Sequence, residues 1–339
     1  MSWAFPNRQG GVQMLQIINL PLTDELLNEY HSKEELISVC KKYNCDGFEV
    51  IWCNEEYKFD YPTEMTIGWH LTFYSDWFDF YNNNQKTLFH KFGSEEIWED
   101  FYGGKNNQIM IQKYEEDLQR ADKAGAKYVV FHVSDISIEE CYTYDMHHSD
   151  EEIIDAAVQI INTLLDGKNY SFDFLVENLH WAGFTFTENK KTKRLLNQIH
   201  YPKKGIMLDI GHLMCTNTNL KTQKDAIQYI HKMLDTHGDL CQYIKGIHLH
   251  QSLSGKYVKE NTGFLPTLPK NYYEKFKQCY SHVLKIDRHE PWTDNNIRTV
   301  IEKISPQYLV HELSGKTRAD KEKALSIQTQ AIKSKREVH

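Results

Sequence analysis

Short apolar runs alternate with longer amphipathic stretches along most of this chain of 339 residues. An apolar run of about four to eight residues suits a buried strand, and apolar residues every three or four positions suit a helix. Alternation of the two is typical of parallel strands joined by helices. The strand-like runs are Met14–Leu20, Gly47–Trp52, Ile67–Phe73, Tyr128–Val133, Phe172–Glu177, Gly205–Ile210, Ile244–His250 and Tyr308–Leu313. Eight such runs predict an α/β fold, a single closed (β/α)8 barrel.

The segments between these runs carry helix signals. Ser149 and Glu152 have the spacing of a capping box, in which a hydroxyl precedes a glutamate by three residues at a helix start. No long linker rich in Pro, Gly or Ser and no internal repeat divides the chain. We therefore expect one domain over residues 1–339, with the barrel core at about 12–315 and a closing helix at about 316–335.

Two segments are too long for ordinary connections. Phe78–Asn107 follows the third predicted strand, and Leu253–Lys285 follows the seventh. Long loops in a compact domain are usually lids or walls of a binding site, and the alternative is a surface insertion. We expect two long loops at these places.

The composition is that of a folded protein, with 40% hydrophobic and 25% charged residues. Lys and Arg number 39 against 47 Asp and Glu, a formal charge of −8, which argues against a broadly basic surface for DNA but leaves a local basic groove open. No run reaches the roughly 18 apolar residues of a membrane span, and no signal-peptide pattern opens the chain. With seven Cys and no C-x-x-C pair, we expect a cytoplasmic protein without contact to a membrane.

Ionisable residues lie at or near the end of nearly every predicted strand from the third to the eighth. These are His70, His132, Glu177, Asp209, His212, His248, His250 and Glu312. The ends of parallel barrel strands converge on one face, where active sites form. Burying so many acids and imidazoles together is costly without a cation, and both are good ligands for zinc or manganese. Each alone could be a core or loop residue with satisfied hydrogen bonds, so the prediction of metal binding rests on the set.

Asp287 and His289 add a D-x-H pair before the eighth run. Side chains two apart on an extended segment point the same way, which suits joint capture of a metal ion. Arg288 between them could contact a phosphate or pair with a neighbouring acid. On the second strand, Glu49 has two interpretations, a site acid or a structural hydrogen-bond acceptor.

These residues, in this order, resemble the xylose isomerase-like TIM barrels, also called the AP endonuclease family 2 superfamily. The resemblance runs from about Met14 to Glu312 and rests on motifs at the strand ends. In the sugar isomerase and epimerase branch it implies one metal, held by Glu177, Asp209, His248 and Glu312. In the endonuclease IV branch it implies three metals: one held by His70, His132 and Glu177, one by Glu177, Asp209, His248 and Glu312, and one by His212, Asp287 and His289.

Around these positions the sequence departs from the endonuclease. His250 stands where that branch tends to have Asn, and the residues after His70 and after Asn178 differ. The resemblance therefore implies bound metal ions, whereas a DNA substrate does not follow from it. We expect a small-molecule substrate, a phosphate ester or a sugar-like compound. The predicted substrate contacts are His250, Arg288, Trp181 and Tyr74, with core packing as the alternative for the two aromatic residues.

Three functions are compatible with these patterns. The leading hypothesis is a metal-dependent hydrolase of a phosphate ester, with up to three Zn²⁺ or Mn²⁺ ions that activate water and neutralise the phosphate. The second is a single-metal isomerase or epimerase of a sugar or polyol, in which Glu177 and Glu312 are the catalytic acid and base. The third is a barrel that binds a small ligand without catalysis, and the complete set of nine predicted ligands argues against it.

Overall fold

The computed structural model describes residues 13–53 and 59–333. Eight parallel strands close into a barrel in the order β1-β10-β9-β8-β6-β4-β3-β2. The strands are β1 (Leu15–Leu22), β2 (Gly47–Trp52), β3 (Thr66–His70), β4 (Tyr128–His132), β6 (Asp173–Glu177), β8 (Lys204–Asp209), β9 (Ile244–Leu249) and β10 (Tyr308–His311). All eight predicted strands are present, and the (β/α)8 barrel is confirmed.

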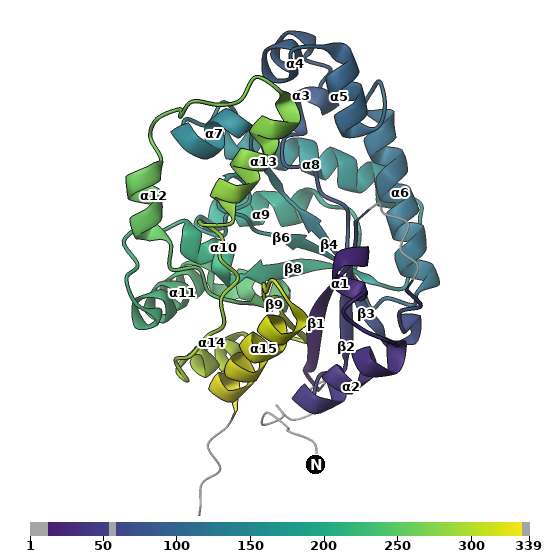
Figure 1. Cartoon of the computed structure of the whole chain (residues 1–339), viewed down its shortest axis with the longest axis vertical. Helices are drawn as coiled ribbons and strands as arrows, with labels where there is room; N and C mark the ends of the chain where they lie inside the picture. Colours follow the sequence, from purple (N-terminus) through teal and green to yellow (C-terminus); the bar gives the residue numbers. More distant parts are fainter. Residues whose placement is uncertain (1–12, 54–58, 334–339) are drawn as a thin grey trace, which may run out of the picture.

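Helices surround this barrel (Figure 1). They include α2 (Lys33–Tyr43), α6 (Gln108–Lys123), α8 (Asp150–Leu165), α9 (Asn189–Gln198), α11 (Gln223–His237), α14 (Ile297–Ile304) and the C-terminal α15 (Arg318–Ile332). The shorter elements are α1 (Asp24–Leu27), α7 (Ile138–Thr143), α10 (Ile210–Cys215), the 3-10 turns η1 (Thr63–Met65) and η2 (Gly238–Tyr243), and a small antiparallel pair, β5 (Ser134–Asp135) with β7 (Ala182–Gly183). The capping box of Ser149 and Glu152 is formed at the start of α8. Within the described part of the chain, none of the helices combines the length and the apolar character that crossing a membrane would require.

The strand alternation decides what fills the barrel. A small cluster of buried side chains, among them Tyr128, Val130, Leu175, Met207 and Val310, forms the interior. Because side chains alternate from face to face, the residue two positions further along each strand points inward as well. Those next inward positions are occupied by His132, Glu177, Asp209 and Glu312. The apolar interior therefore ends, at the carboxyl side of the barrel, in a layer of acids and imidazoles.

The two long segments are present, but the prediction that they are loops is wrong. Phe78–Asn107 contains α3 (Phe78–Tyr81), α4 (Gln85–Phe92) and α5 (Glu95–Tyr102), and Leu253–Lys285 contains α12 (Gly255–Asn261) and α13 (Tyr272–Val283). The side chain of Asn84 caps α4, and Gly93 and Gly103, in the left-handed region with φ of 88° and 79°, end α4 and α5. In the sequence these Asn and Gly residues are typical of loops. In the structure they stand at the ends of short helices.

The two insertions pack against each other through aromatic rings. Tyr272 of α13 stacks on Phe92 of α4 with ring centroids 4.3 Å apart, and Phe276 meets Phe101 of α5 at 5.5 Å. In Figure 1, α3, α4, α5, α7 and α13 gather at one end of the molecule. Since the insertions follow β3 and β9, they form one joined wall at the carboxyl side of the barrel.

Candidate metal centre

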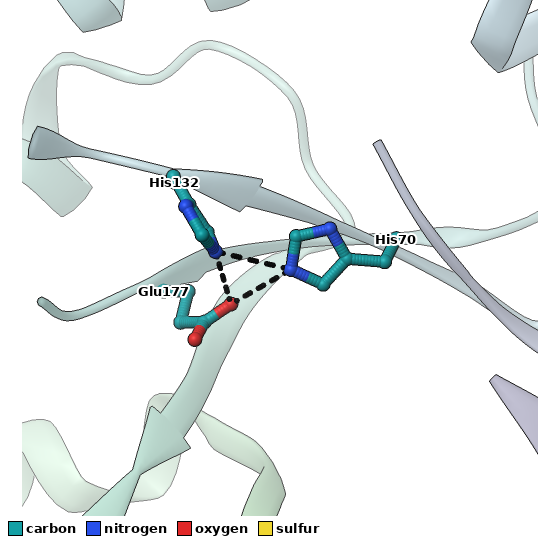
Figure 2. A group of neighbouring side chains, drawn as sticks. All are labelled: His70, His132 and Glu177. Carbon is teal, nitrogen blue, oxygen red and sulfur yellow. Dashed lines mark hydrogen bonds and ion pairs between the residues drawn. The ribbon is translucent and has the colours of Figure 1, made fainter. Parts of the chain in front are cut away.

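Three side chains from neighbouring strands β3, β4 and β6 form the first group of the centre (Figure 2). The Nε2 atoms of His70 and His132 lie 3.1 Å apart, and Oε2 of Glu177 is 3.3 Å from the first and 3.2 Å from the second. Tetrahedral ligands at about 2.0–2.1 Å from a zinc ion are about 3.3–3.4 Å from one another. Nδ1 of His70 donates to the carbonyl of Leu71 at 2.9 Å. The lone pair on Nε2 is therefore available to a cation.

The second group lies beside the first and shares Glu177 with it. Nδ1 of His248 is 3.2 Å from Oε1 of Glu177, 3.1 Å from Oε2 of Glu312 and 3.7 Å from Oδ2 of Asp209. All four residues are buried, with exposed fractions of 8% or less. Within the described residues, both Glu177 oxygens, Nδ1 of His248 and Oε2 of Glu312 are buried atoms that form no hydrogen bond. Buried polar atoms without partners are rare, so a set that converges on one point fits a divalent cation.

Glu49 on β2 holds His248 from the other side of its ring. Its carboxylate oxygens lie 3.0 and 3.2 Å from Nε2 of His248, and its Oε2 accepts a hydrogen bond from the Tyr128 hydroxyl at 2.7 Å. Gly68 makes room for the Tyr128 ring, because a Cβ at that position would come within 2.2 Å of it. The Glu49 contact fixes Nδ1 of His248 as the atom that faces the second group. Of the two interpretations of Glu49, the structure therefore supports an acid that orients a site histidine.

Replacing Glu49 with glutamine is expected to weaken zinc binding by about 10–100-fold, because the imidazole loses a charged partner that orients it and raises its basicity. Calorimetric titration of the chelator-treated protein with zinc measures the effect. Glu64→Gln, an exposed acid of the η1 turn, is the matched control and should bind as the unmodified protein does. Equal affinities for both variants would contradict this assignment.

The third group joins α10 to the segment before α14. Oδ2 of Asp287 lies 3.1 Å from Nε2 of His212 and 2.6 Å from Nε2 of His289. The other ring nitrogens donate to backbone carbonyls, His212 to Asn178 at 3.0 Å and His289 to Glu312 at 3.1 Å. Both rings therefore present Nε2 to the same point. His289 also has a φ of 48°, uncommon for a residue with a side chain and a feature that clusters at functional sites.

The nine side chains predicted as ligands thus lie together in the three predicted groups. Within each group, one ligand atom per residue lies within 4.8 Å of the others. The same distance criterion also joins His250, His289 and Glu312. That fourth combination is unsuited to one ion, because the rings of His250 and His289 stack at 3.9 Å with an angle of 3° between them, and lone pairs that lie in two parallel ring planes do not meet at one point.

The four predicted substrate contacts have different surroundings. His250 is fully buried, and its Nε2 lies 2.8 Å from Oδ2 of Asp209, so it orients that acid. Arg288 pairs with Glu290 and is partly exposed. Trp181 is buried in a hydrophobic cluster, and Tyr74 packs against Tyr102 and Tyr114 on the α5 and α6 side. The Trp181 ring also lies 4.0 Å from the ring of His180, which neighbours His212.

Two further residues at the centre were absent from the predicted site. Phe73 is 50% exposed and stacks on His132 at 4.7 Å; the sequence marked it only as one of several aromatic residues that could either stack on a substrate ring or pack in the core. His180 lies with its ring centroid 5.8 Å from that of His212, and its two buried ring nitrogens form no hydrogen bond with any residue that the structure describes. Burial, followed by the repulsion of His212, lowers the pKa of His180 to about 3, so it is a neutral imidazole.

The electrostatics of the centre favour a cation. Burial alone would raise the pKa of the Glu177 carboxyl, but His248 and His132 hold it well below its usual range. Burial likewise opposes the proton on His248, yet Glu312 and Glu49 raise the pKa of that imidazole well above its ordinary value. The acids are ionised and draw positive charge to the neighbouring rings. A divalent ion would supply that charge in place of the imidazole protons.

The family model of the xylose isomerase-like TIM barrels matches residues 37–305. The chain therefore belongs to the xylose isomerase-like TIM barrel family. A search of curated proteins found no match. The closed barrel agrees with this membership.

Solved structures share the fold at low sequence identity. One is the IolI protein with a binding zinc atom, 13% identical, with 94% of this chain and 96% of that chain covered and a TM-score of 0.51. Another is mannonate dehydratase from Streptococcus suis serotype2, at 11% identity, 95% and 93% coverage and a TM-score of 0.52. A third is the crystal structure of AsfvAP:AG, at 10% identity, 95% and 99% coverage and a TM-score of 0.54. At these identities the likeness concerns the fold alone.

Proposed function

We propose that this protein is a metal-dependent hydrolase of phosphate esters, with up to three Zn²⁺ or Mn²⁺ ions at its centre. The observation that carries the proposal is the third group, where Nε2 of His212 and Nε2 of His289 both face Oδ2 of Asp287. A single-metal site of the second group does not require these residues. Close divalent ions supply a nucleophilic water and neutralise the phosphate charge in hydrolysis of this kind.

The residues of the chain then have separate tasks. Glu177 faces the first group with Oε2 and the second group with Oε1, so it would bridge two ions. His250 and Glu49 would orient Asp209 and His248 from behind. Phe73, half-exposed over His132, offers a flat apolar face on which a ring of the substrate could stack.

A small phosphate ester suits the surroundings better than duplex DNA. The formal charge is −8, and Arg288, the basic residue between Asp287 and His289, already pairs with Glu290. The insertions after β3 and β9 join into one wall at this side of the barrel. We therefore propose a small-molecule substrate.

Asp287→Asn is expected to lower hydrolysis of bis(p-nitrophenyl) phosphate by at least about 10–100-fold, because the third group loses the carboxylate that both imidazoles face. The assay uses protein loaded with zinc or manganese, and metal content is measured alongside. Asp294→Asn serves as the control, since that acid lies in the following loop and bonds Asn296. No hydrolysis by the metal-loaded parent protein, or an unchanged rate for Asp287→Asn, would contradict the proposal.

The second candidate is a single-metal isomerase or epimerase of a sugar or polyol. The observation that favours it is the position of Glu177 and Glu312, which approach Nδ1 of His248 at 3.2 and 3.1 Å from different strands. Two carboxylates around one ion could take and return the proton next to a carbonyl. Exchange of a carbon-bound hydrogen with deuterated water, followed by NMR on ketose sugars, would reveal this activity. In that case Asp287→Asn should leave the exchange largely intact.

A further inference from the structure

One amide side chain of the C-terminal helix reaches the back of the metal centre. Gln328 of α15 is fully buried. Its Nε2 donates to the carbonyl of Leu249 at 2.7 Å and lies 3.0 Å from Nδ1 of His311, and its Oε1 accepts from the backbone N–H of Trp292 at 3.1 Å. An amide has two N–H donors and one carbonyl, so these three bonds use both donors and the oxygen.

The three partners of Gln328 belong to three different segments, and each segment carries residues of the centre. Leu249 stands between His248 and His250 at the end of β9, and His311 directly precedes Glu312 at the end of β10. Trp292 lies three residues after His289. One side chain, remote in sequence, therefore ties together three segments, through the backbone of Leu249 and Trp292 and the side chain of His311, next to residues of the second and third groups.

The segment from Asp287 to Trp292 depends on such ties because it lies outside the barrel strands. The Trp292 indole N–H donates to the His250 carbonyl at 2.8 Å, and the Ser252 hydroxyl donates to Oδ1 of Asp287 at 3.0 Å. Gln251 and Glu290 exchange two backbone hydrogen bonds, at 2.8 and 3.0 Å. The third group is thus held against the end of β9, and Gln328 fastens Trp292 at one end of this segment.

Hydrogen bonds at both ring nitrogens hold the imidazole of His311, which precedes Glu312. Nε2 of His311 lies 3.2 Å from Oε1 of Gln16, so the ring donates there and accepts from Gln328 at Nδ1. The chain of Gln16, His311 and Gln328 therefore links β1, β10 and α15 through fixed donors and acceptors.

We infer that Gln328 is a positioning residue of the metal centre: through Leu249, His311 and Trp292 it sets the places of the second and third groups. This inference rests on the proposed metal-dependent function. The first group contains His70 and His132 on β3 and β4, and none of the three hydrogen bonds of Gln328 reaches those strands. Loss of the Gln328 side chain should therefore weaken metal binding at the second and third groups and leave the first group unchanged.

The test compares Gln328→Met, which keeps the volume but removes all three hydrogen bonds, with Thr329→Val on the same helix. Thr329 is buried too, but among the described residues its hydroxyl bonds only to carbonyls of α15, those of Leu325 and Ser326. Crystals of the full chain are soaked with limiting zinc, and anomalous scattering gives the occupancy at each group; calorimetry gives the affinities in solution. We expect Gln328→Met to weaken binding at the second and third groups by about 10–100-fold, with the first group and Thr329→Val unchanged.

A general loss of stability would lower the zinc occupancy of all three groups together. Equal losses of zinc affinity at the three groups, or no loss at any of them, would therefore overturn the inference. Gln328→Glu provides a second variant if Gln328→Met does not fold. It keeps an acceptor for Trp292, but an ionised carboxylate cannot donate to Leu249, and the same selective loss is expected. Parent protein that binds zinc at none of the groups would instead reject the proposed function itself, and the inference with it.

Discussion

Glu177→Gln is expected to lower phosphodiester hydrolysis by more than about 1,000-fold and to reduce the bound metal by up to two ions per chain. Glu177 faces His70 and His132 with one oxygen and His248 with the other. An amide offers one neutral oxygen in place of two oxygens that share a negative charge, and its NH₂ group would point at the nitrogen lone pairs. Elemental analysis of the purified protein and initial rates with bis(p-nitrophenyl) phosphate measure both effects.

A matched control lies on the same strand. Asp173 stands at the opposite end of β6, where it pairs with Lys245 at 2.7 Å, and Asp173→Asn should retain both metal and activity. Far-ultraviolet circular dichroism confirms that each variant folds. If Glu177→Gln kept its metal content and its rate while folded, the assignment of Glu177 as a bridging ligand would be wrong.

Zinc or manganese is expected to raise the melting temperature of the chelator-treated protein by about 5 °C or more. A ligand at 100 times its dissociation constant stabilises the folded state by about 2.7 kcal/mol per site. One kcal/mol corresponds to about 2–4 °C for domains of somewhat smaller size. In this protein the metal is expected to stabilise the fold because it would bond buried atoms that have no hydrogen-bond partner among the described residues. These include both oxygens of Glu177 and Nδ1 of His248. Differential scanning calorimetry at several metal concentrations measures the shift.

Magnesium at the same concentrations is the control for ionic effects. It prefers six oxygen ligands, whereas five of the nine side chains at this centre are imidazoles, so we expect little or no shift. Glu177→Gln should lose most of the zinc effect. An equal shift with magnesium, or none with any of the three metals, would rule out a specific site of nitrogen and oxygen ligands.

Much of the centre could be predicted from the period-two alternation of side chains along the strands. The apolar residues Leu175 and Met207 lie two positions before Glu177 and Asp209, so a prediction that placed the strands correctly also placed the acids on the inner face. The eight strands are confirmed. In the first insertion, α4 and α5 were missed because each has eight residues and ends at a Gly, and Asn84 precedes α4; Asn and Gly are equally typical of loops.

Other parts of the centre could not be predicted, because they depend on contacts between residues far apart in the chain. Glu49 and His248 are 199 positions apart, and only closure of the barrel brings their side chains to 3.0 Å. Gln328 looks like an ordinary polar residue of a closing helix until its three partners are known. The same holds for Tyr74, for which the sequence left substrate contact and core packing open, and whose ring packs against Tyr114 in the structure.

By itself, the sequence determined the barrel and the kinds of side chain at its carboxyl side, because period-two alternation and residue type are local properties. The tertiary structure alone decided which nitrogen of each imidazole faces the centre. For His70 that choice depends on the carbonyl of Leu71, and for His248 on the carboxylate of Glu49. A proton occupies the nitrogen that has an acceptor, and acceptors are placed by the packing of the whole chain.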